Sequence, residues 1–390
     1  MIDKKARASK RIIAIDTLRA LTMLLMVFVN DFWTLKGVPE WLKHAYPKED
    51  YLGFSDIIFP LFLFIVGLSI PFAIDHRRNK GESVTTIARH IITRSVSLLI
   101  MGVFMVNYEN IHGESVWIGK YAWGLLMALG LALIWIDWKR SRLAPKWRTI
   151  MPALGTILLI GLALIYRGGA EGEVWMRPYW WGILGLIAWA YLANALIYLF
   201  AKGNMVMVIV SFLGFHFLAV AWHAGWLPEL GPVANIFSTI ISGTLPAFTA
   251  AGMLASVLFK YQQQQTQSLN AIYLVLVLLG VLSIAYGFAV RPYWGISKQA
   301  ATPAWLGICS GIGFLSFAFF YWLMDQKGKV SWSKIIAPAG TATLTCYLVP
   351  YFIYPAREMT GLILPEFLRT GMIGLFKAMC FALLVVLVTG

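Results

Sequence analysis

Residues 56–67 read Asp-Ile-Ile-Phe-Pro-Leu-Phe-Leu-Phe-Ile-Val-Gly, and they begin the second of two apolar segments near the N-terminus. The first segment ends in Asn30 and Asp31, and a polar loop that carries His44 joins the two. Polar groups at the depth of the membrane hydrocarbon are costly and tend to serve a function. We therefore expect the functional centre of the chain within residues 12–74.

The composition is typical of a membrane protein with many spans. The chain has 390 residues, of which 59% are hydrophobic and only 13% are charged. Apolar runs of about 20 residues, the length that crosses a bilayer as a helix, recur along most of it. These features exclude a soluble enzyme and predict an all-α bundle of about 11–12 membrane-spanning helices in a single domain, residues 1–390.

The expected helices follow the apolar runs, with boundaries that carry an error of several residues. A model with eleven spans would place the C-terminus on the other side of the membrane and leave the centre unchanged. The twelve expected ranges are 12–34, 55–74, 90–107, 118–138, 149–166, 179–200, 205–222, 234–259, 270–290, 302–324, 336–355 and 369–389.

The net charge of +14 indicates orientation in the membrane. Lys and Arg occur in short runs between the apolar segments, as the positive-inside rule predicts, so we expect lipid rather than nucleic acid as the partner. The basic residues at positions 4–11 and 139–142 are two of these runs. The N-terminus is then cytoplasmic, and the His44 loop faces the periplasm of a bacterial inner membrane.

The three cysteines, Cys309, Cys346 and Cys380, fall inside apolar segments without a metal-binding spacing. We interpret them as packing residues and expect no metal site. The first apolar run is long and no small-residue cleavage site follows it. We therefore expect it to stay in the protein as a helix.

Four short motifs resemble a known family. They are Asp16-Thr17-Leu18-Arg19, Met26-Val27-Phe28-Val29-Asn30, Lys43-His44-Ala45 and residues 56–67. Their order and spacing are similar to those in the first half of the catalytic domain of the heparan-α-glucosaminide N-acetyltransferases and their bacterial relatives. The resemblance is strongest over residues 12–74. It implies transfer of an acetyl group from cytosolic acetyl-CoA, across the membrane, to the amine of a glucosamine, with Asn30 and His44 as the catalytic pair.

The chemistry of these side chains suits that reaction. His44 can remove the ammonium proton or accept the acetyl group itself, and the alternative is a surface histidine. Asn30 can polarise the thioester carbonyl, or it can simply end a helix. Asp56 can orient His44, or it can be an N-cap, because Ser55-Asp56 before an apolar run is also a helix-start signal.

Further residues are candidate binding groups at the outer mouth of the bundle. Asp31 can orient His44 or bind the substrate ammonium, Lys298 can supply a cation, and Trp294 is a candidate substrate contact. Trp33, Trp41 and Trp305 are expected to flank the same mouth.

Two arginines are candidate contacts for acetyl-CoA. Asp16 and Arg19 lie one helical turn apart, so Arg19 either braces the bundle through an ion pair or meets a phosphate of the cofactor. Arg94 lies within an apolar segment, where an unpaired charge is expensive. We therefore expect it to face the bundle or a wet cavity.

Two departures from the human-type enzymes keep other functions open. Residues 123–130 lack a Gln-Arg pair that those enzymes carry, and helices at 179–222 stand where they have a large lumenal loop. The acetyltransferase is the first interpretation, a transporter of an amino sugar or cell-wall sugar is the second, and a structural role is the third. A homodimer is compatible with the sequence, but nothing in it requires one.

Overall fold

The structure, a computed structural model, describes residues 12–138, 144–179, 181–227, 231, 235–264 and 269–389. The basic residues at positions 4–11 and 139–142 lie outside the described ranges. Within these ranges every expected apolar segment forms helix. The helices are α2 Ile13–Asn30, α3 Ser55–Asn79, α4 Val84–Glu109, α5 Lys120–Trp135, α6 Trp147–Leu164, α7 Ile183–Phe200, α8 Met205–His223, α10 Ser238–Ile241, α11 Thr244–Gln264, α12 Leu269–Trp294, α13 Pro303–Phe320, α14 Ala337–Thr341, α15 Thr343–Thr360 and α16 Gly371–Thr389.

The all-α membrane architecture is confirmed. Among the described residues, nine helices are long and apolar enough to cross a membrane. The expected number of about 11–12 is larger because three further segments, at α5, α11 and α15, are shorter or less apolar than this criterion requires. Their helices still pack within the bundle.

Two expected helices are interrupted, which the hydrophobic pattern did not predict. The range 234–259 divides into α10 and α11 at Gly243, whose φ of +75° is a left-handed conformation that favours glycine. A Cβ atom there would lie 2.4 Å from the carbonyl oxygen of Phe215, so α8 approaches this break closely. The range 336–355 likewise divides into α14 and α15 at Ala342.

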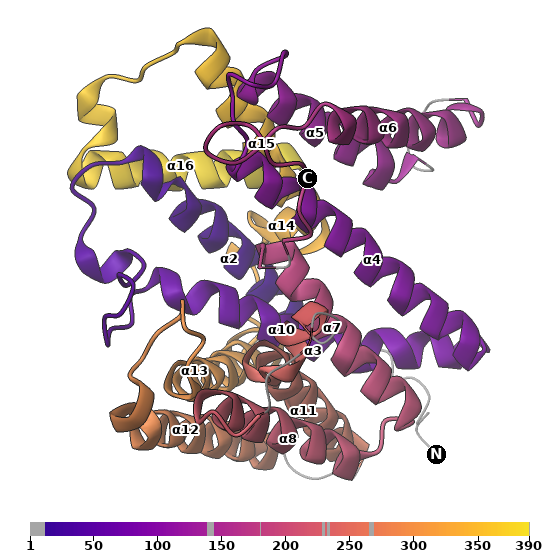
Figure 1. The fold of residues 1–390 in the computed structure, drawn as a ribbon. Coiled ribbons are helices and arrows are strands. Elements are labelled where there is room, and N and C mark those ends of the chain that lie inside the picture. The colour runs from indigo at the N-terminus through magenta and orange to yellow at the C-terminus, as the bar shows by residue number, and fades with distance from the viewer. Residues whose placement is uncertain are drawn as a thin grey trace.

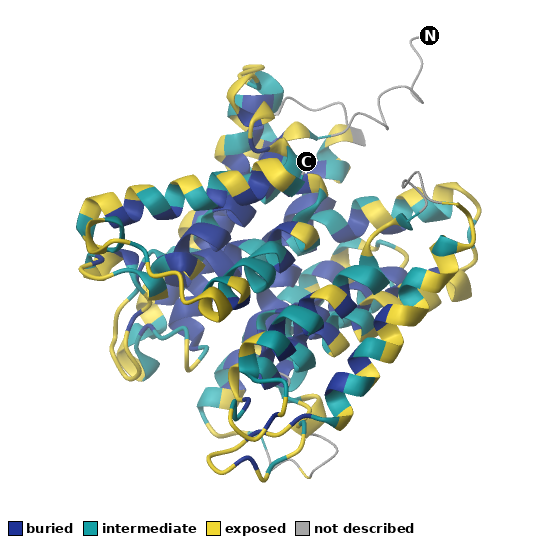
Figure 2. Ribbon diagram, turned by 90° about the horizontal axis from the view of Figure 1, so that it is seen from above, coloured by how far each residue is buried: buried dark blue, intermediate teal, exposed yellow. Residues whose placement is uncertain are grey.

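Helix α3 is the centre of the bundle and packs against α2, α7, α11 and α13 (Figure 1). The contact with α11 is very close, since a Cβ atom on Gly67 would lie 1.9 Å from the carbonyl oxygen of Thr249. Small residues at such crossings let helix backbones approach each other in a membrane. Buried residues concentrate on the inner faces of the helices, and exposed residues lie at the periphery (Figure 2).

Ion pairs between distant segments form at both ends of the bundle. At one end Asp75, at the end of α3, pairs with Lys260 and accepts a hydrogen bond from the Tyr198 hydroxyl at 2.9 Å. At the other end Asp50 pairs with Arg291 at 2.8 Å. Each pair joins segments that the sequence places on one side of the membrane. The contacts therefore agree with the expected alternation of loops, while the end that faces the cytoplasm stays a prediction.

Candidate functional site

The His44 imidazole lies against the buried carboxylate of Asp56. Nδ1 of His44 is 2.7 Å from Oδ1 of Asp56, and the Asp56 side chain is 1% exposed. Its Oδ2 accepts hydrogen bonds from the backbone N–H groups of Ala45 at 2.9 Å and Gly53 at 3.1 Å. Three contacts therefore fix the carboxylate, which in turn fixes the imidazole. The His44 side chain is 44% exposed and open to a substrate.

The loop reaches this position because it is tied back to the start of α3. Ser55 Oγ donates to the carbonyl oxygen of Leu42 at 2.5 Å. Gly53 permits the approach, since a Cβ atom there would lie 1.8 Å from the Lys43 carbonyl oxygen. The N-cap of α3 is Phe54, without a side-chain cap. The alternative role of Asp56 as an N-cap is therefore not seen, and its carboxylate faces the loop.

Lys298 completes a cluster of three ionisable groups. Its Nζ is 3.1 Å from Nδ1 and 3.4 Å from Nε2 of His44. Burial lowers the pKa of Lys298, and the Asp56 carboxylate opposes that shift. The imidazole thus lies between an anion and a cation. The structure brings together His44, Asp56 and Lys298, which the sequence had proposed as site residues.

Asp50 holds the loop that carries Lys298 against the loop that carries His44. Its carboxylate contacts Arg291 Nε at 2.8 and 3.1 Å and accepts from the Ile296 backbone N–H at 2.7 Å. Burial raises the pKa of Asp50, but the bonds from Ile296 and Arg291 outweigh it and lower the pKa. The position of Lys298 relative to His44 therefore depends on a carboxylate far from it in sequence.

Asn30 is the last residue of α2 and is exposed. Its side-chain amide makes no hydrogen bond to any residue that the structure describes, so it is available to a ligand. Asp31 is 2% exposed and turns the other way. Its Oδ2 accepts from Lys377 Nζ at 2.7 Å, and its Oδ1 accepts from the Tyr354 hydroxyl at 2.9 Å. The structure thus joins Asp31 to α15 and α16, with no bond to His44.

The tryptophans expected at the mouth differ in position. Trp33 and Trp41 are exposed, at 62% and 60%. Trp294 is half-buried and donates to the His223 carbonyl oxygen at 3.2 Å. The expectation was wrong for Trp305, which is 1% exposed and donates to the Asp56 backbone carbonyl at 3.1 Å. Trp305 therefore lies beneath the site, where its indole N–H supports the first turn of α3.

The two arginines proposed as contacts for acetyl-CoA lie in different surroundings. Arg19 pairs with Asp16 at 3.4 Å and donates to Ser69 Oγ at 2.6 Å, which favours the bracing role. Arg94 was expected to face the bundle or a wet cavity, and its guanidinium does lie against the ring of Tyr191 on the neighbouring helix α7, while a contact with a cofactor stays a prediction. Arg94 is exposed on α4, with its guanidinium 5.0 Å from the ring centroid of Tyr191. A long arginine stem can carry the charge away from hydrocarbon, and stacking on an aromatic ring compensates it.

Lys377 and Tyr354 are two polar residues near the site that sequence reasoning missed. A signal for Lys377 was present, because it is the only charged residue in the range 369–389 apart from Arg369 at its start. An ionisable residue within a membrane segment requires a partner. The sequence did not indicate which residue that partner would be.

Comparison with known proteins agrees with the resemblance found in the motifs. Residues 11–167 match the family model of heparan-alpha-glucosaminide N-acetyltransferase, catalytic. The enzyme of that name from Mus musculus is 32% identical over 130 residues, which cover 33% of this chain and 19% of the mouse protein. Its Homo sapiens counterpart is 33% identical over 122 residues, covering 31% of this chain and 18% of the human protein.

The matched range includes Asn30, His44 and Asp56, but it ends before Lys298. The resemblance predicted from the motifs is thus confirmed over a longer stretch than residues 12–74. The alignments span about a fifth of the length of the two curated relatives.

Proposed function

We propose that the chain is an acetyltransferase of a bacterial inner membrane. It moves an acetyl group from cytosolic acetyl-CoA to the amine of a glucosamine-type sugar on the outer side. The observation that carries the proposal is the contact between Nδ1 of the exposed His44 side chain and the buried Asp56 carboxylate. Support comes from the N-acetyltransferase family match, which includes both residues.

The contact with Asp56 assigns different roles to the two ring nitrogens. If Nδ1 donates its hydrogen to the carboxylate, Nε2 carries the lone pair that a general base requires. The substrate amine must take the place of the Lys298 ammonium, which lies 3.4 Å from Nε2. The sugar amine then forms a bond to the acetyl carbon while Nε2 takes its proton. The carbon–sulfur bond of the thioester breaks, and the thiolate of CoA leaves and receives a proton. The products are an N-acetyl sugar and CoA.

The same geometry supports a second route to the same products. Nε2 can attack the thioester carbon itself, so that CoA leaves first and an acetyl-histidine carries the group to the amine. In both routes negative charge develops on the carbonyl oxygen. The Asn30 amide and the Lys298 ammonium are the groups proposed to stabilise it.

The remaining predicted contacts take weaker roles in this proposal. Trp294 is the last residue of α12, four residues before Lys298, and is proposed to contact the sugar. Asp31 is proposed to hold the end of α2 in position through its bonds to Lys377 and Tyr354, and not to contact the substrate. Arg94 is the better candidate for a cofactor phosphate, because it is exposed and lies near Arg77 and His90, whereas Arg19 is engaged in the bundle.

The test is turnover of acetyl-CoA by the purified full chain in detergent, with glucosamine as acceptor. We expect His44→Ala and Asp56→Asn to lower kcat by roughly 10²- to 10⁴-fold, the usual contribution of a general base. Asn30→Ala is expected to lower it to a similar extent. His112→Ala is the matched control, because His112 lies in another loop, where it bonds Ser115 at 2.8 Å.

The two routes can be distinguished in an experiment without the acceptor sugar. Radiolabelled acetyl that stays on the wild-type protein, but not on His44→Ala, would support the acetyl-histidine. Wild-type protein that neither binds acetyl-CoA nor releases CoA would refute the enzyme. Uptake of labelled amino sugars into proteoliposomes would then become the relevant measurement.

A further inference from the structure

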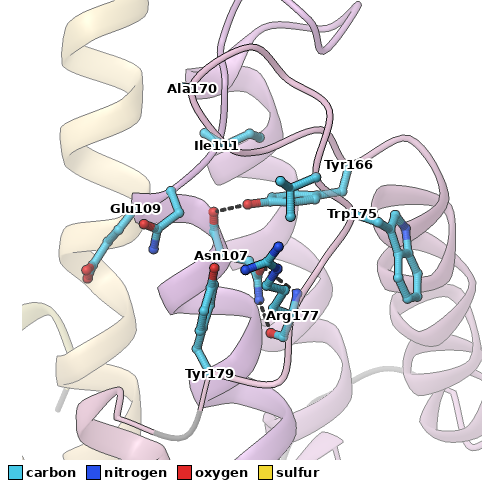
Figure 3. Close-up of a pocket in the computed structure, with 11 residues that line it drawn as sticks. Asn107, Glu109, Ile111, Tyr166, Ala170, Trp175, Arg177 and Tyr179 are labelled. Carbon is cyan, nitrogen blue, oxygen red and sulfur yellow. Dashed lines mark hydrogen bonds between the residues drawn. The ribbon is translucent and has the colours of Figure 1, made fainter.

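A polar pocket lies outside the His44 cluster. Its volume is about 380 Å³, and it is formed by residues 107–111 at the end of α4 and by the connection 166–179 between α6 and α7 (Figure 3). That volume is at the small end of the range for ligand sites, about 300–1,000 Å³. The proposed acetyl transfer uses none of the residues that line it.

The walls of the pocket are held in place by one buried amide. Asn107 is 1% exposed. Its Oδ1 accepts from the Arg177 backbone N–H at 3.1 Å, and its Nδ2 donates to the Arg177 carbonyl oxygen at 2.8 Å. The Tyr166 hydroxyl donates to the Asn107 carbonyl oxygen at 3.0 Å. These bonds fix the connection to α4, so the pocket is preorganised rather than formed on binding.

Arg177 places a cation in this pocket. Its guanidinium points toward the space beside Asn107 and Tyr166 (Figure 3). No acidic side chain pairs with it among the described residues. Glu109 also lines the pocket, but Figure 3 shows its carboxylate directed away from Arg177. Arg177 is exposed, and no hydrogen bond engages its guanidinium within the part of the chain that the structure describes, so it can bind a planar anion with two parallel hydrogen bonds.

Aromatic rings provide the other side of the pocket. Trp175 is 57% exposed, and its Nε1 donates to the Ala163 carbonyl oxygen at 2.7 Å, which fixes the orientation of the ring. Tyr179 lies beside Arg177 (Figure 3). A pyranose ring presents C–H groups on its faces and hydroxyls at its edge. A rigid aromatic surface next to polar groups therefore matches it.

Helix α15 contacts both the region beside the pocket and the end of α2. The rings of Tyr108, next to the pocket, and Tyr351 of α15 have centroids 6.4 Å apart. One turn further along α15, Tyr354 bonds Asp31, the residue after Asn30. The pocket is therefore at the same end of the bundle as the His44 cluster, the end expected to face the periplasm.

We propose that this pocket binds a sugar that carries a carboxylate, with the Arg177 guanidinium on the carboxylate and the neighbouring Tyr179 ring against the sugar ring (Figure 3). The proposal goes beyond the acetyl transfer and does not depend on it. The competing occupant is the headgroup of an anionic lipid, because aromatic residues also gather at membrane interfaces.

The test measures binding rather than turnover. The full chain in detergent is titrated with glucuronate and with glucose, and the affinities come from calorimetry and from tryptophan fluorescence. We expect glucuronate to bind at least about tenfold more tightly than glucose, because only glucuronate offers a carboxylate for a charge-assisted hydrogen bond. Arg177→Met should abolish that difference, and Arg177→Lys should retain part of it.

Two further variants test whether glucuronate binds in this pocket and not elsewhere on the protein. Arg167→Met is the matched control, because Arg167 lies in the same connection, does not line the pocket, and bonds the Tyr166 carbonyl oxygen at 3.1 Å. His44→Ala should bind glucuronate as the wild type does, even where it has lost turnover. The proposal is wrong if Arg177→Met binds glucuronate unchanged or if the wild type does not discriminate between the two sugars. It is also wrong if only phosphatidylglycerol in nanodiscs occupies the pocket.

Discussion

Lys377 Nζ lies 2.7 Å from the carboxylate of Asp31 and thereby joins α16 to the end of α2, next to Asn30. The two side chains are 19% and 3% exposed. The Tyr354 hydroxyl at 2.9 Å and Thr34 Oγ1 at 3.2 Å complete the bonds to Asp31. Because a buried charge must be paired, this contact fixes the position of the residue proposed to polarise the thioester.

Removal of Lys377 should therefore destabilise the protein. In Lys377→Met the Asp31 charge is left buried without its cation, a change that costs about 3–5 kcal/mol in buried pairs. The double variant Asp31→Asn with Lys377→Met should recover much of this loss, because no unpaired charge remains. Thermal unfolding of the purified protein in detergent measures both. Equal destabilisation by the single and the double variant would show that the unpaired Asp31 charge is not the cause of the loss.

The approach of the His44 loop to α3 depends on the absence of a side chain at Gly53. A Cβ atom there would lie 1.8 Å from the Lys43 carbonyl oxygen. Gly53→Ala must therefore push residues 43–44 away from Asp56. A misplacement of about 1 Å can lower a rate by roughly 10²-fold, and we expect a loss of kcat/KM of that size in a folded protein.

The matched control for this substitution is Gly161→Ala, because a Cβ atom on Gly161 would meet nothing within 4 Å. It should leave turnover unchanged. Retained turnover in Gly53→Ala would mean that the contact between His44 and Asp56 is not needed for the reaction.

Asp50 should control how firmly the two loops of the site hold together. Asp50→Asn removes the charge that pairs with Arg291, and we expect faster hydrogen exchange in residues 43–54 and roughly threefold to tenfold lower kcat/KM. Glu49→Gln is the control in the same loop, where Glu49 accepts from the Tyr46 backbone N–H at 3.1 Å.

The pH dependence of this effect follows from the lowered pKa of Asp50. A carboxyl group whose pKa is below its ordinary value of 3.8 contributes stability above that pH, and the contribution is lost as pH falls through the lowered pKa. The wild type and Asp50→Asn should therefore differ throughout the neutral range and converge in strong acid. An exchange difference that already disappears near pH 6 would contradict this account.

The candidate site residues that lie near one another in the sequence could be proposed together. The contact with the residue distant in sequence could not be predicted. Asn30, His44 and Asp56 lie within one pair of apolar segments, so the motifs identified them together. Lys298 could be placed on the outer side by counting spans, but its contact with His44 depends on how α12 and α13 pack. The pairing of Asp31 with Lys377 depends on the same kind of packing.

The fold shows the same limit. Hydropathy located every apolar segment because each must cover about 30 Å of hydrocarbon. Mean hydropathy alone did not reveal the break at Gly243, although Ser242-Gly243-Thr244 followed by Pro246 interrupts the apolar run there. The sequence likewise placed Arg94 against the bundle, but it could not show that the guanidinium stacks on Tyr191, because that contact depends on how α4 and α7 pack.

Lys298 should determine the alkaline side of the pH profile. Burial lowers the pKa of its ammonium group from the ordinary 10.5, with the Asp56 carboxylate opposing the shift, so the group loses its proton below pH 10.5. If its charge stabilises the oxyanion, kcat/KM should fall as pH rises through the lowered pKa. Lys298→Met should be slower than the wild type below the lowered pKa, should lack this alkaline limb, and should approach the wild type above it. Lys298→Arg should keep activity to higher pH, because a guanidinium stays charged above pH 12. An identical alkaline limb in all three proteins would assign that titration to another group and remove Lys298 from the proposed site.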